Sequence, residues 1–263
     1  MTTVAPPRVL PSRPSFLARH QFLIYRLFSL RGLVPVGAYL CIHLVTNAAV
    51  LGSPSTFQSQ VDSIHNLGIL LPIVEWTFIF IPILFHAVVG WLIISGAMPN
   101  NSAYPYPGNL RFTLQRVTAI IIFFFILFHV LHMHKTLGGP FEPVGGAAFD
   151  PEHAASSAGR ALQGSLWIQI VYAVGVLASA YHLANGLWTF GLTWGIWTSP
   201  AAMRRANYIS LVFGVALAAV GLAALVGMIR VDVGHAYKIE TQMQQAKRLT
   251  TGEIGDNPVE APQ

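Results

Sequence analysis

Five long runs of apolar residues, separated by shorter polar stretches, dominate the hydrophobic pattern of the chain. The runs cover about 30–52, 69–97, 113–134, 164–195 and 206–230. At a rise of about 1.5 Å per residue, a helix over each run is long enough to cross a hydrocarbon layer of about 30 Å. Only helices and closed barrels satisfy the backbone in lipid, and these runs are too long and too uniformly apolar for barrel strands. The pattern therefore predicts an all-α membrane protein with a bundle of five transmembrane helices.

The same pattern divides the chain into three parts. Residues 1–29 are predicted to form a cytoplasmic N-terminal segment, 30–230 the membrane domain and 231–263 a polar C-terminal tail. The N-terminal segment has no short apolar stretch followed by a cleavage site of small residues, so we expect no cleaved signal peptide. The sequence closes with TTGEIGDNPVEAPQ, a polar stretch that we expect to be poorly ordered.

Composition supports the membrane assignment. Of the 263 residues, 54% are hydrophobic and only 10% are charged, whereas about a quarter of the residues of a soluble domain are charged. The surplus apolar residues have no soluble core to fill. The formal net charge of +5 does not indicate nucleic-acid binding, because basic residues in membrane proteins report topology.

The arginines lie mainly on one side of the predicted membrane. They precede or open the first span, or lie between spans two and three and between spans four and five. Those residues are Arg8, Arg13, Arg19, Arg26, Arg31, Arg111, Arg116, Arg204 and Arg205. The basic side is expected to face the cytoplasm, which places the N-terminus inside and the C-terminus outside. The basic residues of the tail, Lys238, Lys247 and Arg248, run against this assignment.

The single cysteine, Cys41, excludes several kinds of site. The chain can form no intrachain disulfide, no CxxC metal site and no CxxCH attachment of a c-type haem. It also lacks a GxGxxG dinucleotide fingerprint and a cysteine cluster for iron–sulfur ligation. Flavin binding by that fingerprint and iron–sulfur chemistry would therefore belong to other chains.

Four histidines, His43, His86, His129 and His182, lie one in each of the first four predicted spans. Ionisable residues inside a membrane are costly and normally face the interior of a bundle. A single such histidine could serve only to bond a neighbouring helix, but four in successive spans point to a shared chemical role. Glycine follows four residues after two of them, at the same helix face, and leaves room for a flat cofactor.

Two bis-histidine haem sites would use all four imidazoles, with the axial ligands on facing helices. A single zinc or copper site would need all four at one depth. Counting along the predicted spans displaces His43 and His129 toward the outer face, and His86 and His182 toward the inner face. The depths favour the pairs His43–His129 and His86–His182. A transporter with histidine proton relays is a further alternative, although broken helices and inverted repeats are not visible.

Four segments carry a family resemblance. They read RLFSLRGLVPVGAYLCIHLVTN, FIPILFHAVVG, LQRVTAIIIFFFILFHV and YHLANGLWTFGLTWGI. In this order they resemble the five-helix, dihaem cytochrome b subunit of succinate dehydrogenases, of the Bacillus-like type that reduces menaquinone, and its relatives among fumarate reductase anchors. The resemblance covers about residues 22–225, and the four histidines stand at the family's ligand positions. The N-terminal extension, the enlarged loop 135–163 and the tail lie outside it.

The resemblance implies a membrane anchor with two haem b groups in a bacterial cytoplasmic membrane. The inner haem would be ligated by His86 and His182 and the outer haem by His43 and His129. Succinate would be oxidised on a separate flavoprotein subunit, and an iron–sulfur subunit would pass electrons through the haems to a quinone, with menaquinone expected. The alternatives are a quinol:fumarate reductase working in the opposite direction, or another quinone-linked respiratory complex.

Further residues are candidates for supporting roles. Five polar residues at the inner ends of spans one and three could bind haem propionates, although simple membrane anchoring explains the arginines equally well. They are Arg26, Ser29, Arg31, Gln115 and Arg116.

At the opposite face, Glu75 is a candidate for proton transfer at a quinone site, with an interfacial carboxylate facing water as the alternative. Four more histidines lie on or near that face, namely His65, His132, His134 and His153. Because residues i and i+2 of a helix point in different directions, we expect an interfacial or solvent role for His132 and His134. Three tryptophans are expected to serve packing and an inner aromatic belt, namely Trp188, Trp194 and Trp197.

Overall fold

The computed structural model of the chain describes residues 16–96 and 99–251. Within these ranges it contains helices and loops and no strand, as the apolar pattern predicts. Arg8, Arg13 and the last twelve residues of the predicted tail lie outside the described ranges.

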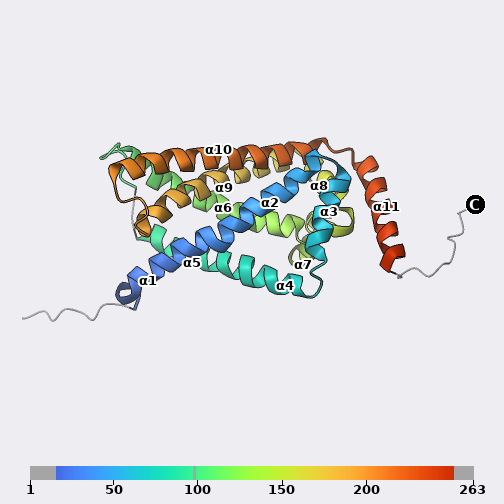
Figure 1. The fold of residues 1–263 in the computed structure, drawn as a ribbon, viewed down its shortest axis with the longest axis horizontal. Coiled ribbons are helices and arrows are strands. Elements are labelled where there is room, and N and C mark those ends of the chain that lie inside the picture. The colour runs from blue at the N-terminus through green and yellow to red at the C-terminus, as the bar shows by residue number, and fades with distance from the viewer. Residues whose placement is uncertain (1–15, 97–98, 252–263) are drawn as a thin grey trace, which may run out of the picture.

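Five helical rods run along the molecule (Figure 1). Each is long and apolar enough to cross a membrane, which confirms the five predicted spans. The first two rods are composite and the other three are single helices. The first comprises α1 (Phe16–Arg31), η1 (Gly32–Gly37), α2 (Ala38–Ala48) and η2 (Ala49–Leu51); the second comprises α4 (Leu70–Glu75), η3 (Trp76–Phe80) and α5 (Ile81–Ser95); the others are α6 (Pro107–Met133), α9 (Leu166–Thr193) and α10 (Pro200–Arg230).

Two of the helices begin earlier than their apolar runs. α6 begins at Pro107 and α10 at Pro200, each with proline in the first turn, where its missing N–H costs no helical bond. The Ser199 hydroxyl caps α10 by accepting from the amide of Ala202 at 3.2 Å. Helical hydrogen bonding therefore continues through polar turns that hydropathy assigns to loops, because capping residues and not apolarity determine where a helix begins.

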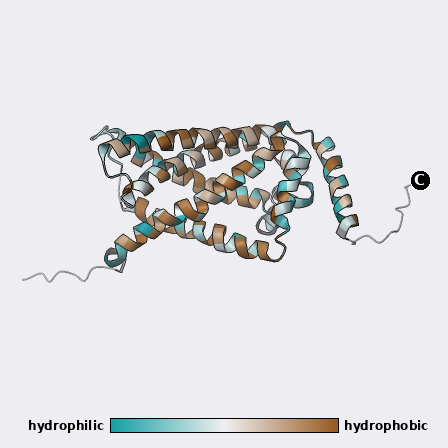
Figure 2. Cartoon of the chain, viewed as in Figure 1, coloured by the Kyte–Doolittle hydropathy of each residue, from teal (hydrophilic) through white to brown (hydrophobic). Residues whose placement is uncertain are grey.

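The outer surface of the rods is apolar (Figure 2). Large side chains such as Leu84, Phe124, Leu211 and Val212 are more than half exposed on three different rods of the bundle. Contact with water would cost about 25 cal/mol for each Å² of such surface, so this surface is suited to lipid.

The rods approach one another through small residues. α9 packs against α6 and α10, and α10 packs against α2. A side chain at Gly221 of α10 would come within 2.6 Å of Val176 on α9, so this crossing requires glycine. Close approach of backbones through small residues is the usual basis of helix association in lipid, where burial of apolar surface gives little driving force.

The first rod bends at η1. Val34 leaves the helical conformation with φ −129° and ψ 110°, and Pro35 follows it. Proline has no N–H to donate and pushes the preceding residue toward extended geometry. The break lets α1 and α2 run in different directions across the bundle.

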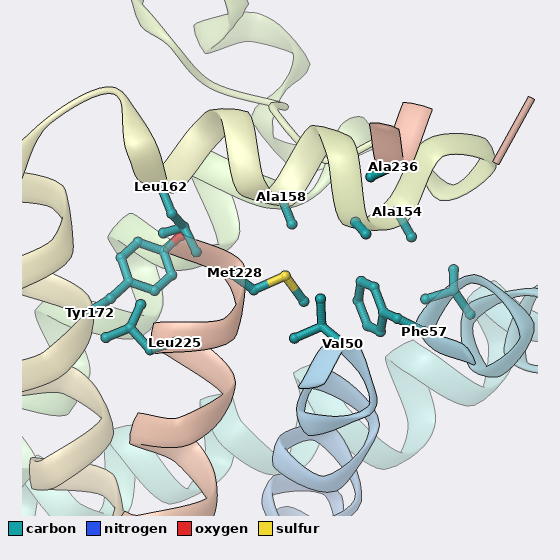
Figure 3. Close-up of a cluster of buried hydrophobic side chains, with 11 residues drawn as sticks. Val50, Phe57, Ala154, Ala158, Leu162, Tyr172, Leu225, Met228 and Ala236 are labelled. Carbon is teal, nitrogen blue, oxygen red and sulfur yellow. The ribbon is translucent and has the colours of Figure 1, made fainter. Parts of the chain in front are cut away.

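A group of short helices covers one end of the bundle, opposite α1 (Figure 1). We call α3 (Pro54–His65), η5 (Pro151–His153), α8 (Ala154–Gln163) and α11 (Val233–Thr251) the end cap. α11 packs against the other three, and a buried cluster that includes Phe57, Ala158 and Met228 joins the cap to the ends of α2, α9 and α10 (Figure 3). The connection from α6 to the cap contains α7 (Lys135–Gly138) and η4 (Gly139–Val144).

Two fully buried polar side chains hold the end cap together. Gln58 of α3 donates to the carbonyl of Pro151 at 2.7 Å and accepts from the amide of Ala154 at 2.9 Å. Glu240 of α11 accepts from the hydroxyl of Ser156 at 2.6 Å and from the amide of Ala155 at 2.5 Å. A carboxylate is well placed there, because the first turn of α8 presents unpaired N–H groups and a positive dipole end.

Replacement of Glu240 by alanine should loosen the end cap. The change removes the carboxylate that accepts from the amides of Ala155 and Ser156 and leaves the Ser156 hydroxyl only the carbonyl of His153 at 3.3 Å. Each buried donor left unsatisfied costs about 1–3 kcal/mol. Hydrogen exchange of the purified protein in detergent should accelerate at the start of α8 and along α11, but not in the five rods. Gln245→Ala, at an exposed position of α11, is the matched control. Unchanged exchange in the Glu240 variant would contradict this assignment.

Candidate functional site

The four intramembrane histidines come together in two pairs. His43 of α2 faces His129 of α6, with ring centroids 5.8 Å apart and planes at 77°. His86 of α5 faces His182 of α9, with centroids 6.3 Å apart and planes at 84°. Each pair therefore joins two rods that are not consecutive in the sequence.

The two pairs lie at different levels of the bundle. His182 contacts Thr118 of α6, whereas His129 lies eleven residues further along the same helix. At about 1.5 Å per residue, this spacing separates the levels by about 16 Å. The His43–His129 pair is nearer the end cap, and the His86–His182 pair is nearer α1.

The ring separations suit a metal ion shared by each pair. A histidine nitrogen binds a metal at about 2 Å, so two imidazoles on opposite sides of one ion have centroids about 6 Å apart. Among the described residues, no three His, Cys, Asp or Glu side chains come together as a metal-ligand group. The four histidines therefore do not form the single zinc or copper centre that the sequence left open.

One histidine of each pair has a hydroxyl at its Nδ1 atom. The Nδ1 atom of His182 lies 3.3 Å from the Thr118 hydroxyl, which itself donates to the carbonyl of Leu114 at 2.7 Å. The Nδ1 atom of His129 lies 3.3 Å from the Tyr172 hydroxyl. A hydrogen bond donated from Nδ1 fixes the tautomer and leaves the lone pair of Nε2 available to a metal.

The other two histidines are held differently. The Nε2 atom of His43 has a long contact of 3.4 Å with the amide of Asn47. His86 stacks on Phe28 with centroids 4.2 Å apart, and its buried Nδ1 atom has no hydrogen bond of normal geometry among the described residues. A side chain at Gly32 would come within 2.5 Å of the His86 ring, so glycine is needed for the first rod to approach His86.

The space beside the two glycines differs. A side chain added at Gly186, one turn beyond His182, would meet no described atom within 4 Å. At Gly90, one turn beyond His86, the Phe28 ring lies 3.5 Å from the same position. The face of α9 beside His182 is therefore open enough for a flat group, which fits the donor set of the pair.

Two arginines at the α1 end have buried N–H groups that are free to bind an anion. The guanidinium of Arg26 lies 4.4 Å from the Phe22 ring and 5.0 Å from the Trp194 ring. The guanidinium of Arg116 lies 3.3 Å from the Phe112 ring. The Nε atoms of both arginines are buried without a hydrogen bond in the described part of the chain, so a carboxylate there would satisfy them.

The other candidate propionate residues are placed differently. Arg31 lies over the Phe85 ring at 5.3 Å, and Ser29 is half-buried. Gln115 donates to the carbonyl of His182 at 3.2 Å and accepts from the amide of Asn185 at 2.8 Å. Gln115 thus positions the backbone that carries His182.

At the end-cap side, Glu75 and His134 approach each other at 3.8 Å. Both side chains are partly buried, and His134 also lies edge-on to Phe80. The pair joins the second rod to the end of α6.

His65 and His153 make their contacts within the end cap. His65 bonds the carbonyl of Val61, and His153 contacts Asp150 and Thr241 in the end cap.

The three tryptophans cluster near the α1 end. Trp197 donates to the carbonyl of Trp188 at 3.1 Å, and Arg111 lies 4.3 Å from the Trp188 ring. Trp194 stacks on Phe190 and also contacts Arg26. These contacts are those of packing residues.

His132 differs from the expectation of an interfacial or solvent role. Its side chain is buried, stacks on Phe128 and places Nδ1 2.8 Å from the Tyr172 hydroxyl. The chain beyond η4 returns over the end of α6, where the amide of Ala148 donates to the carbonyl of His132 at 2.8 Å, and this return covers the histidine.

Sequence reasoning missed Tyr172 and Thr118. Thr118 stands eleven residues, about three turns, before His129 on α6, so a polar residue on the histidine face was a usable signal. Tyr172 is a polar aromatic residue inside an apolar run. Its partners lie on another helix, and residue spacing along one helix gives no information about contacts between helices.

Comparisons with known proteins agree with this architecture. Residues 104–223 match the model of the family described as "Succinate dehydrogenase/Fumarate reductase transmembrane subunit". The chain is 35% identical over 205 residues to the succinate dehydrogenase cytochrome b558 subunit of Bacillus subtilis, a match that spans 78% of this chain and 96% of that protein. The chain therefore belongs to the succinate dehydrogenase/fumarate reductase family of transmembrane cytochrome b subunits.

Proposed function

We propose that this chain holds two haem b groups and passes electrons from an iron–sulfur subunit to a quinone within a succinate:quinone oxidoreductase. The observation that carries the proposal is the separation of four partly buried histidines into two pairs at two levels. His86 and His182 would ligate the inner haem, and His43 and His129 the outer haem. The Bacillus subtilis relative is a succinate dehydrogenase subunit, which supports succinate oxidation as the direction.

Each bound haem would supply a one-electron carrier at its level of the membrane. The protein side of the site has three tasks. The imidazoles stay neutral and each would supply one ring nitrogen as ligand, and the helices exclude water. Hydroxyl groups hold the rings of His182 and His129, and the Gln115 amide holds the backbone of His182. At the inner level, Arg26 and Arg116 would bind propionates through their buried N–H groups.

The proposed orientation places α1 on the cytoplasmic side and the end cap outside. The arginine distribution supports this orientation. The flavoprotein and iron–sulfur subunits would then dock at the α1 end, where the inner pair lies nearest. The single cysteine of the chain is consistent with clusters held by a separate subunit.

A quinone, with menaquinone expected, would be reduced near the outer pair, and that reaction consumes protons. Glu75 and His134, 3.8 Å apart and partly buried, can carry protons from the surface toward this level. We therefore assign proton delivery to Glu75, with His134 as its partner.

Replacement of His129 by alanine tests the ligand assignment. The variant should fall from about two haems per chain to about one, and the remaining haem should keep the spectrum of the inner site, because each pair holds its own iron. Haem content is measured as the pyridine haemochrome of the purified protein. His65→Ala, at an exposed histidine, should retain both haems. Absence of low-spin b haem from the unmodified protein would refute the proposed function.

Replacement of Arg116 by glutamine should lower the midpoint potential of the inner haem. A positive charge beside a propionate favours the reduced haem, and its removal favours the ferric state. A redox titration followed by optical spectroscopy should show the shift for one haem only. Arg205→Gln, at an exposed position of α10, is the control. If the midpoint potential of the inner haem were the same in the Arg116 and Arg205 variants, Arg116 would be assigned to membrane anchoring.

Replacement of Glu75 by glutamine should slow quinone reduction by about tenfold or more, since a positioned proton carrier is lost. Succinate oxidation by the whole complex with a soluble dye as acceptor should stay unchanged, as should the haem content. Glu142→Gln, at an exposed glutamate of η4, provides the control. Normal quinone reduction in the Glu75 variant would show an interfacial carboxylate without a role in proton delivery.

A further inference from the structure

The Tyr172 hydroxyl joins two histidines of α6. It lies 3.3 Å from Nδ1 of His129 and 2.8 Å from Nδ1 of His132. The tyrosine comes from α9, so these contacts connect two rods at the level of the outer pair. His132 has no place among the proposed iron ligands, and its contact with Tyr172 gives it a different role.

The direction of both hydrogen bonds follows from the ligand role of His129, and the inference therefore rests on the proposed function. If Nε2 of His129 binds iron, the proton of the neutral ring is on Nδ1, and Nδ1 donates to the Tyr172 oxygen. The tyrosine proton is then free to be donated to Nδ1 of His132. The reverse direction would place the His129 proton on Nε2 and leave no lone pair there for a metal.

Protein contacts alone hold the Tyr172 ring in position. It is 6% exposed and belongs to the buried cluster with Leu162 of α8 and Leu225 of α10 (Figure 3). Phe125 and Phe128 meet the ring edge-on, with centroids 5.5 and 6.0 Å away. The hydroxyl is thus held in position by the end cap on one side and by α6 on the other.

The inner pair provides a comparison within the same molecule. The Thr118 hydroxyl approaches Nδ1 of His182 but donates its own proton to the backbone carbonyl of Leu114. That chain of hydrogen bonds ends in the helix, whereas the one from His129 continues to a second histidine. Each chain contains two hydrogen bonds and the two differ in the final acceptor, a backbone carbonyl in one and a histidine ring in the other. Successive hydrogen bonds polarise one another, so the His132 ring acts on His129 through the Tyr172 hydroxyl.

We propose that Tyr172 is a positioning residue for the outer haem ligand, and that the chain His129–Tyr172–His132 sets the orientation and the donor strength of His129. A hydrogen bond from Nδ1 makes the imidazole a stronger electron donor to the metal. It stabilises the ferric state and lowers the midpoint potential of the outer haem. His132 acts through Tyr172 by accepting its proton.

Tyr172→Phe is the decisive variant, because it keeps the packed ring and removes only the hydroxyl. The midpoint potential of the outer haem should rise, by about 59 mV if the equilibrium constant of this one-electron couple changes tenfold. The inner haem should not move. The electron paramagnetic resonance spectrum of the outer ferric haem should also change, because the His129 ring loses its orienting partner.

Two further variants complete the test. His132→Leu should shift the outer potential in the same direction by less, since it removes only the second acceptor. Tyr208→Phe, at an exposed tyrosine of α10, should change neither haem. Haem content is measured for every variant. Two bound haems with an unmoved outer potential in Tyr172→Phe would overturn the positioning role alone, whereas absence of haem from the unmodified protein would overturn the proposed function.

Discussion

Hydrocarbon offers no hydrogen bonds, and this constraint governs the whole structure. Every polar group within the bundle must find its partner inside the protein. The backbone does so as helix, and His182 and His129 do so with a hydroxyl group beside each Nδ1 atom. A group that is costly alone in lipid becomes stable when it is coordinated or bonded. The residues of the candidate site are therefore the polar residues that occur inside the apolar runs of the sequence.

The same physics explains which features could be predicted. Hydropathy measures transfer into lipid, so it found all five rods. It could not locate the beginnings of α6 and α10, which depend on proline and on a serine cap. Counting along the spans grouped the histidines by depth, since rise per residue is constant in a helix. The same count gives no information on side-chain partners across helices, and for this reason Tyr172 was not found.

The end cap, in contrast to the five rods, could not be predicted from hydropathy. The face that α11 buries includes Ala236, Glu240 and Gln244, and two of these three residues are polar. A search for apolar periodicity therefore describes the segment as a polar tail. The end cap is stabilised by the Glu240 carboxylate at the N-terminus of α8 and by the Gln58 amide, which bonds the distant Pro151 carbonyl. Such contacts depend on the tertiary fold, and no local sequence pattern predicts them.

The position of Glu240 in the chain has a consequence for biosynthesis. Translation proceeds from the N-terminus, so all five rods emerge before the residue that completes the start of α8. The carboxylate that accepts from the first turn of α8 is therefore made after Tyr172 and the other residues of α8 and α9 in the same buried cluster. The contacts of the end cap can therefore be completed only after the last helix, α11, has been made.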